Sequence, residues 1–256
     1  MIALQLYTIR DQLQDPVTLG GVLARVREIG YRAVEVAGLS PAARQNFGRE
    51  LVRAGLVAFA GHSPLEQLRA DPDGVAAEFR EWGCDFVVVP ALPNAERTLD
   101  GFRSFAAEAG ELAGRLRRHG LQLVYHNHAY ELERFGDRTG LETMLDSTAP
   151  DALAFELDTY WLQHGGANPS AWIRRYSGRA PLVHCKDMAV DRGTPYQAEV
   201  GEGNLDWADI LDACRGAKTR WLIVEQDESR RSPMDSVAIS YENLSRLMEG
   251  AGLRDA

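Results

Sequence analysis

The stretch that decides the fold is Asp85–Tyr125, which reads DFVVVPALPNAERTLDGFRSFAAEAGELAGRLRRHGLQLVY. It begins and ends with short apolar runs, as expected of strands that are covered on both faces in a parallel sheet. Between them, Leu99–His119 carries apolar residues at three- and four-residue steps, which is typical of a helix with one buried face. These residues are Phe102, Phe105, Ala106, Ala109, Leu112, Ala113 and Leu116. The stretch therefore predicts a βαβ unit with parallel strands.

The same unit repeats along the whole chain. Eight apolar runs start about 24 to 39 residues apart, the length of a strand, a crossover helix and two short loops. Ser40-Pro41 is typical of a helix start, and glycines follow most helical segments. The runs are Ile2–Tyr7, Arg32–Ala37, Leu56–Ala60, Asp85–Pro90, Leu121–Tyr125, Ala152–Leu157, Pro181–Cys185 and Arg220–Val224. Eight such units predict an α/β fold, a closed (β/α)8 TIM barrel.

A doubly wound sheet is the alternative arrangement, but Leu6–Arg10 after the first run lacks the glycine-rich dinucleotide turn. No break in composition separates two parts, so we expect a single barrel domain over residues 1–256. The one long connection, at about 187–206 after the seventh run, is rich in Gly, Asp and Glu. A segment of this length is either a flap over the active site or a plain surface insertion.

Composition excludes several classes of function. The chain has 28 Lys and Arg against 37 Asp and Glu, a net charge of −9, which argues against a nucleic-acid partner. No run approaches the roughly 20 apolar residues that a membrane helix needs, and the first residues lack the pattern of a signal peptide. Three scattered cysteines indicate no disulfide scaffold. We expect a cytoplasmic protein with no membrane partner, and leave open whether it forms homo-oligomers.

Polar residues gather where the apolar runs end, which in a barrel of this kind is the face that carries the chemistry. His126, Asp158, His184 and Glu225 follow four successive runs, from the fifth to the eighth. Taken singly, each could be a helix cap, a surface charge or a hydrogen-bonded packing residue. Taken together they predict a divalent-metal site, because several ionisable groups at one barrel mouth need a partner. Imidazole and carboxylate ligands are compatible with Mn²⁺, Co²⁺, Fe²⁺ or Zn²⁺.

The motifs at these positions resemble the sugar phosphate isomerase/epimerase family of xylose-isomerase-like TIM barrels. They are LQLYTIRD at the start, GHS, YHNHAYELE, ELDTYW, HCKD, GEGNLDW and VEQD. The resemblance implies one divalent metal, most often manganese, with Asp158, His184 and Glu225 among its ligands. Many relatives have a glutamate at the fifth strand that is both ligand and base, and here His126 takes its place. The YHNH run also resembles inosose dehydratases and lyases of keto-sugars and keto-glycosides.

The resemblance also implies roles in the reaction. Glu225 is the candidate general base, and His128 the candidate acid because imidazole titrates nearest neutral pH. His62, Glu131 and Lys186 are candidate substrate-binding residues. For these three the alternatives are a structural histidine, a solvated loop carboxylate, and an ion pair of Lys186 with Asp187 or Glu156.

The expected substrate is a small sugar, keto-sugar or cyclitol. The expected reaction is proton abstraction next to a carbonyl through an enediolate, in a metal-dependent isomerase or epimerase. Two alternatives stay open, namely a dehydratase or lyase that works by β-elimination and a barrel that binds a sugar without catalysis. The sequence does not decide which sugar is used, whether it is phosphorylated, or which metal is bound.

Overall fold

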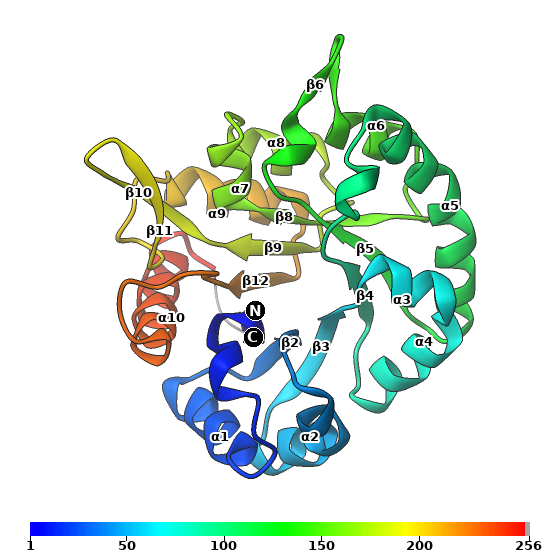
Figure 1. Ribbon diagram of the computed structural model, residues 1–256. Helices are drawn as coiled ribbons and strands as arrows, with labels where there is room; N and C mark the ends of the chain where they lie inside the picture. Colours follow the sequence, from blue (N-terminus) through cyan, green and yellow to red (C-terminus); the bar gives the residue numbers. More distant parts are fainter. Residues whose placement is uncertain (254–256) are drawn as a thin grey trace.

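Eight parallel strands close into a barrel in the computed structural model, which describes residues 1–253 (Figure 1). Their order around the barrel is β1, β12, β9, β8, β5, β4, β3, β2, and the last pairs with the first. The predicted barrel is confirmed. The strands are β1 (Ile2–Gln5), β2 (Ala33–Val36), β3 (Val57–His62), β4 (Phe86–Val89), β5 (Gln122–His126), β8 (Ala154–Asp158), β9 (Leu182–Cys185) and β12 (Trp221–Val224).

Helices form the outer ring of the barrel (Figure 1). The residues predicted to face the sheet in α5 are all buried, and α2 begins where Ser40-Pro41 predicted, with the Ser40 hydroxyl accepting from Ala43 N at 3.1 Å. The helices are α1 (Leu19–Ile29), α2 (Pro41–Ala54), α3 (Leu65–Ala70), α4 (Pro72–Glu81), α5 (Leu99–Arg118), α6 (Gly140–Asp146), α7 (Thr159–His164), α8 (Pro169–Arg175), α9 (Trp207–Ala217) and α10 (Pro233–Gly250), with short 3₁₀ turns at Leu6–Gln12, Asn94–Glu96 and Tyr130–Leu132. In the part of the chain that the structure describes, no helix has the length and apolar character to cross a membrane.

The lower part of the barrel interior is apolar. Side chains from all eight strands fill it, and the rings of Phe59 and Trp221 stack there at 4.2 Å. Successive inward residues lie two positions apart on a strand, so the interior side chains form layers that follow one another toward the carboxyl ends of the strands. On β8 this order is Ala154, Glu156 and Asp158. Polar side chains therefore enter the barrel only toward the carboxyl ends of the strands.

The long connection after β9 is ordered. It forms a hairpin of β10 (Asp187–Asp191) and β11 (Thr194–Ala198), which projects from the barrel in Figure 1, a regular structure that the sequence did not predict. The buried Asp187 carboxylate holds the segment after the hairpin by accepting hydrogen bonds from five donors. These are the backbone N–H groups of Met188, Gly201, Gly203 and Leu205 at 2.8–3.2 Å and the indole N–H of Trp207 at 2.6 Å. A second, shorter hairpin joins β6 (Arg134–Phe135) to β7 (Arg138–Thr139).

Candidate active site

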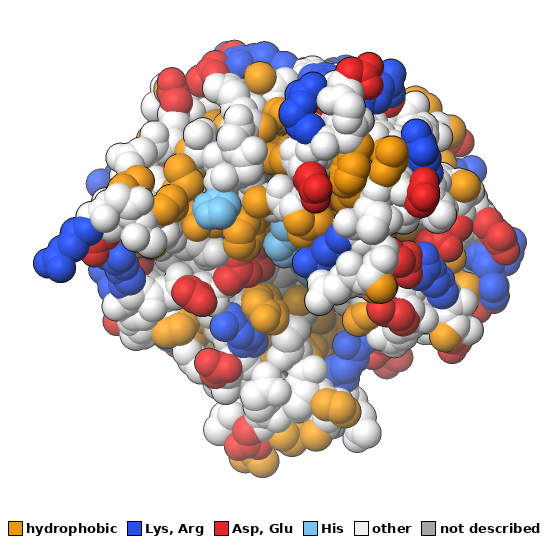
Figure 2. Space-filling view, turned by 45° about the horizontal axis from the view of Figure 1, so that its top comes forward, with side chains coloured by type: hydrophobic (Ala, Val, Ile, Leu, Met, Phe, Trp, Pro, Cys, Tyr) orange, Lys and Arg blue, Asp and Glu red, His pale blue; other side chains and the backbone are white. Residues whose placement is uncertain are grey.

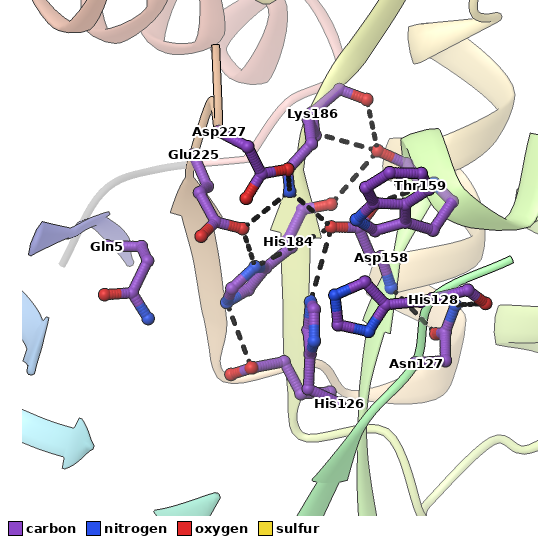
Figure 3. A network of polar contacts seen from close by, with 12 residues as sticks. Gln5, His126, Asn127, His128, Asp158, Thr159, His184, Lys186, Glu225 and Asp227 are labelled. Atoms are coloured by element: carbon purple, nitrogen blue, oxygen red, sulfur yellow. Dashed lines mark hydrogen bonds and ion pairs between the residues drawn. The ribbon is translucent and has the colours of Figure 1, made fainter. Parts of the chain in front are cut away.

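The four residues predicted to bind a metal lie together at the carboxyl ends of their strands. One ligand atom from each of His126, Asp158, His184 and Glu225 lies within 4.8 Å of the other three, and all four side chains are buried. Figure 3 shows them pointing toward one another from β5, β8, β9 and β12. We call these four residues the upper group. The structure brings them together as the sequence predicted, while their role as ligands stays a prediction.

Hydrogen bonds to groups outside the upper group orient His126 and Asp158. The Nδ1 atom of His126 lies 3.3 Å from Pro90 O, a hydrogen-bond acceptor, and this contact turns Nε2 toward Asp158, whose Oδ2 is 3.4 Å away. Asp158 is fixed as well, because its Oδ1 accepts from Trp161 N at 2.8 Å and caps α7. Such outer hydrogen bonds are what orient ligands in metal sites. Two imidazole nitrogens and two carboxylates therefore fit a divalent cation.

Lys186 lies among the carboxylates of this site, with no exposed surface. Its Nζ is 3.1 Å from Asp158 Oδ2, 2.8 Å from Glu225 Oε2 and 2.8 Å from Asp227 Oδ2 (Figure 3). Burial alone would lower the pKa of Lys186, but Asp158 and Glu225 raise it well above its usual value. The suggested ion pairs with Asp187 or Glu156 are wrong, since the partners are these three other carboxylates.

Glu225 is an ionised carboxylate at neutral pH. Burial raises its pKa, but Lys186 and His184 act in the opposite direction and hold the pKa well below its usual value. The Nδ1 atom of His184 is 2.7 Å from Glu225 Oε2. Both this contact and the one with Lys186 are made by Oε2, which leaves Oε1 for other partners.

Asp227 is a site residue to which the sequence assigned no role. It lines the cavity above the upper group, and Gln197 of β11 holds it there. The Gln197 amide nitrogen donates to Asp227 Oδ2 at 2.7 Å, and Asp227 N donates to Gln197 Oε1 at 2.6 Å. The spacing of Glu225 and Asp227 in VEQD was a signal for Asp227, whereas nothing in the sequence pointed to Gln197. The hairpin thus contributes to the site from its base.

A second set of buried groups lies beneath the upper group and shares His184 with it. Glu35 and Glu156 have no exposed surface, and the His62 side chain is 12% exposed. The Nε2 atom of His184 lies 2.8 Å from Glu35 Oε2 and 3.0 Å from Glu156 Oε2. We call Glu35, His62 and Glu156 the lower group.

The cavity at this end of the barrel has a volume of about 290 Å³. In Figure 2 a histidine side chain (pale blue) is visible inside a hollow in the surface. A cavity of this size, with polar groups converging on one side, suits one small polar ligand. Its lining residues are Tyr7, His62, Pro90, Ala91, His126, His128, Glu225 and Asp227. A larger cavity of about 490 Å³, lined by the starts of β4 and β5 and by Arg220, includes none of the predicted site residues.

The family is shown by comparison with known proteins. The family described as xylose isomerase-like TIM barrel matches residues 23–247. The chain belongs to this family. The homology to individual relatives is distant, so the family is better defined than the reaction.

Three relatives illustrate the range of this xylose isomerase-like family. An inosose dehydratase of Geobacillus kaustophilus is 25% identical over 92% of this chain and 89% of its own length. The rhizopine catabolism protein MocC of Rhizobium meliloti is 24% identical over 91% of this chain and 82% of its own length. The crystal structure of a sugar phosphate isomerase/epimerase from Parabacteroides distasonis has a TM-score of 0.81 at 20% identity, covering 95% of this chain and 96% of that chain.

His128 differs from the expectation for a group that titrates near neutral pH. It lines the cavity of this xylose isomerase-like barrel, between the rings of Tyr130 and Trp161. Burial, then the neighbouring His126 and Lys186 side chains, lower the pKa of His128 to about 3. The imidazole is therefore neutral at pH 7, and its buried Nδ1 has no hydrogen-bond partner. A neutral imidazole is suited to accepting a proton or a hydrogen bond rather than to acting as a strong acid.

Glu131 is absent from the lining of the cavity, and its contact with substrate stays a prediction. Its side chain has no exposed surface, so the alternative of a solvated loop carboxylate is wrong. Glu131 Oε1 accepts from the Tyr125 hydroxyl at 2.8 Å, and Oε2 accepts from His128 N at 2.9 Å. The carboxylate therefore fixes the backbone that carries His128. His62, by contrast, lines the cavity and also contacts Glu156. Its position therefore fits both a substrate-binding residue and a structural histidine.

Proposed function

We propose that this protein is a divalent-metal-dependent isomerase or epimerase of a small sugar, keto-sugar or cyclitol. The observation that carries the proposal is the convergence of His126, Asp158, His184 and Glu225 beside the cavity. These four residues would hold the metal, with Mn²⁺ as the first candidate and Co²⁺, Fe²⁺ and Zn²⁺ compatible with the same ligands. When bound, a divalent cation supplies stabilisation of the negative charge that develops on the substrate oxygen.

Glu225 is the base in this proposal. Its carboxylate lines the cavity and is kept ionised by Lys186 and His184, and Oε1 is the oxygen free to reach a substrate carbon. Removal of a proton next to a carbonyl and its return to the neighbouring carbon give an isomerisation, and return to the opposite face of the same carbon gives an epimerisation. Lys186 keeps the charge balanced around the base, because an ammonium within 3.1 Å of three carboxylates offsets their repulsion.

His128 and Asp227 handle the rest of the substrate. The neutral His128 imidazole, with an unpaired buried Nδ1, can accept a hydroxyl proton at the cavity wall. Lys186 and Gln197 both bond to Oδ2 of Asp227, and among residues 1–253 no group donates to Oδ1. That oxygen is available to a substrate hydroxyl group, which supports a polyhydroxylated ligand.

A second candidate reaction is β-elimination from a keto-sugar or inosose. It is favoured by the residue on β5, where His126 replaces the second carboxylate that a two-base epimerisation would use on the opposite face of the substrate. The relative named inosose dehydratase also supports it. In this case Glu225 removes the proton and the C–O bond at the β carbon breaks. The departing hydroxyl group, hydrogen-bonded to His128, takes up the proton from Glu225 and leaves as water.

The test is incubation of metal-loaded protein with a panel of ketohexoses, their phosphates and inososes in D₂O, followed by proton NMR. Deuterium uptake without loss of water supports the isomerase or epimerase, and loss of water supports the dehydratase. Glu225→Gln should lose activity while keeping its fold by circular dichroism. Glu199→Gln is a matched control, because Glu199 is also a buried carboxylate but contacts Ser236 and Arg231 instead. Sugar binding without exchange or elimination across the panel would instead indicate a binding protein.

A further inference from the structure

The lower group has no part in the chemistry proposed above, although it places two carboxylates where no water reaches them. Glu35 and Glu156 have no exposed surface. Glu156 Oε1 accepts no hydrogen bond, and Glu35 Oε1 lies 3.4 Å from His62 Nε2 without forming one. Burying a charge with an unsatisfied oxygen costs free energy that an apolar side chain of similar size would not. Two carboxylates buried beside the apolar part of the barrel interior therefore call for a functional explanation.

Their contacts converge on one atom of His184. Its Nε2 lies 2.8 Å from Glu35 Oε2 and 3.0 Å from Glu156 Oε2, so one N–H is shared between two carboxylates. Glu156 Oε2 also lies 3.1 Å from His62 Nε2. Burial alone would lower the pKa of His62, but Glu35 and Glu156 raise it to about 10, so His62 offsets part of their charge. The other nitrogen of His184, Nδ1, faces the upper group.

The upper and lower groups each have the composition of a metal site, but they share His184. A neutral imidazole has one lone pair, and its other nitrogen carries a hydrogen. One histidine therefore serves as ligand in one group and as hydrogen-bond donor in the other. The upper group is the one that meets the cavity through His126 and Glu225, whereas Glu35 and Glu156 are absent from its lining.

We propose that Glu35 and Glu156 are positioning residues, which hold the His184 Nε2–H so that Nδ1 is presented to a metal in the upper group. The backbone carbonyl of Pro90 does the same for His126, with the opposite nitrogen. A carboxylate behind a histidine ligand also makes the ligand nitrogen more basic, so two of them strengthen metal binding. The proposal rests on the metal dependence of the proposed function, and it concerns binding rather than turnover.

The experiment is titration of the metal-free protein with Mn²⁺, with free Mn²⁺ measured by electron paramagnetic resonance. Glu35→Leu and Glu156→Leu should each raise the Kd for Mn²⁺ about 10- to 100-fold. Glu35→Gln and Glu156→Gln should have smaller effects, because an amide oxygen still accepts from Nε2–H but carries no charge. Glu199→Gln, the buried carboxylate remote from His184, should change the Kd less than twofold. Thermal unfolding of the metal-free variants is measured beside the titration, because Glu35 and Glu156 also pair with His184 and His62, and a loss of folded protein must be told apart from a loss of affinity.

The possible outcomes distinguish a failure of the proposed function from a failure of the positioning role of Glu35 and Glu156. A wild type that binds no Mn²⁺, Co²⁺, Fe²⁺ or Zn²⁺ overturns the proposed function and this inference together. Wild-type affinity in Glu35→Leu and Glu156→Leu overturns the inference and leaves the proposed function standing. If His62→Ala abolishes binding while His126→Ala does not, the ion is in the lower group and the assignment is reversed. A Tm loss that fully accounts for weaker binding assigns the two carboxylates to folding instead, and also overturns it.

Discussion

Replacing Lys186 by methionine tests how the charges of the site are balanced. The side chain keeps its length and loses its ammonium, so Asp158, Glu225 and Asp227 lose the cation that lies within 3.1 Å of each. Removing one partner of a buried ion pair costs about 3–5 kcal/mol. We expect about 3 kcal/mol for Lys186→Met, the low end, since the Asp227 side chain is 28% exposed and solvent screens it.

For a chain of this size, about 3 kcal/mol corresponds to a Tm decrease of roughly 6–12 °C. The measurement is calorimetry of metal-free protein at pH 7. The matched control is Lys218→Met, because Lys218 is the only other lysine in the sequence and is exposed. A metal ion would use the same oxygens that contact Lys186, so the variant should bind Mn²⁺ at least tenfold more tightly than the wild type.

Two results would refute this reasoning. A Tm for metal-free Lys186→Met within 2 °C of that for Lys218→Met, a difference of under about 1 kcal/mol, would mean that the carboxylates do not depend on the ammonium. An unchanged Kd for Mn²⁺ would mean that the ammonium and the metal do not compete.

Three further predictions concern single contacts. His126→Ala should weaken Mn²⁺ binding by about 10-fold or more in the same titration, because it removes one of four ligands; wild-type affinity would exclude His126 as a ligand. Gln197→Ala should raise the KM for the substrate with little change in the Kd for Mn²⁺, since it frees Asp227 without touching the upper group; an unchanged KM would separate the hairpin from substrate binding. Hydrogen bonds from Arg174 and Ser170 lower the pKa of Asp209 from 3.8 to about 2, so the stability they add is present above pH 4 and is lost as the pH falls toward 2. Urea unfolding of wild type and Arg174→Gln should therefore converge at low pH, and a pH-independent difference would contradict the ion pair.

The architecture was predictable from the sequence because each unit carries its own periodic signal. Phe86–Val89 is apolar without alternation and is buried on both sides, and α5 carries the one stripe that packs on the sheet. The upper group was predictable for a related reason. In a parallel barrel all strands end at the same face, so a polar residue at a strand end is placed without knowledge of its contacts.

The features of the site that the sequence did not predict depend on side-chain packing between segments. The burial of Glu131 is set by Tyr125 on β5 and by the backbone of His128, and no spacing encodes that contact. The neutrality of His128 follows from desolvation and from the nearby His126 and Lys186 side chains, and these contacts become visible only when the loops are in place. The contact of Gln197 with Asp227 joins residues 30 positions apart through a hairpin that the sequence presented only as a long loop.

The hydrogen bonds of Asp187 have a consequence for how a ligand enters the barrel. One carboxylate joins the start of the hairpin to the backbone of residues 201–205 and to the first residue of α9, Trp207. The base of the hairpin cannot swing as a hinged lid unless these bonds break together. We therefore expect entry to depend on side-chain rearrangement at the rim, at Tyr7 and Asp227, and turnover to be insensitive to solvent viscosity. The fixed width of the opening would then select ligands by their size.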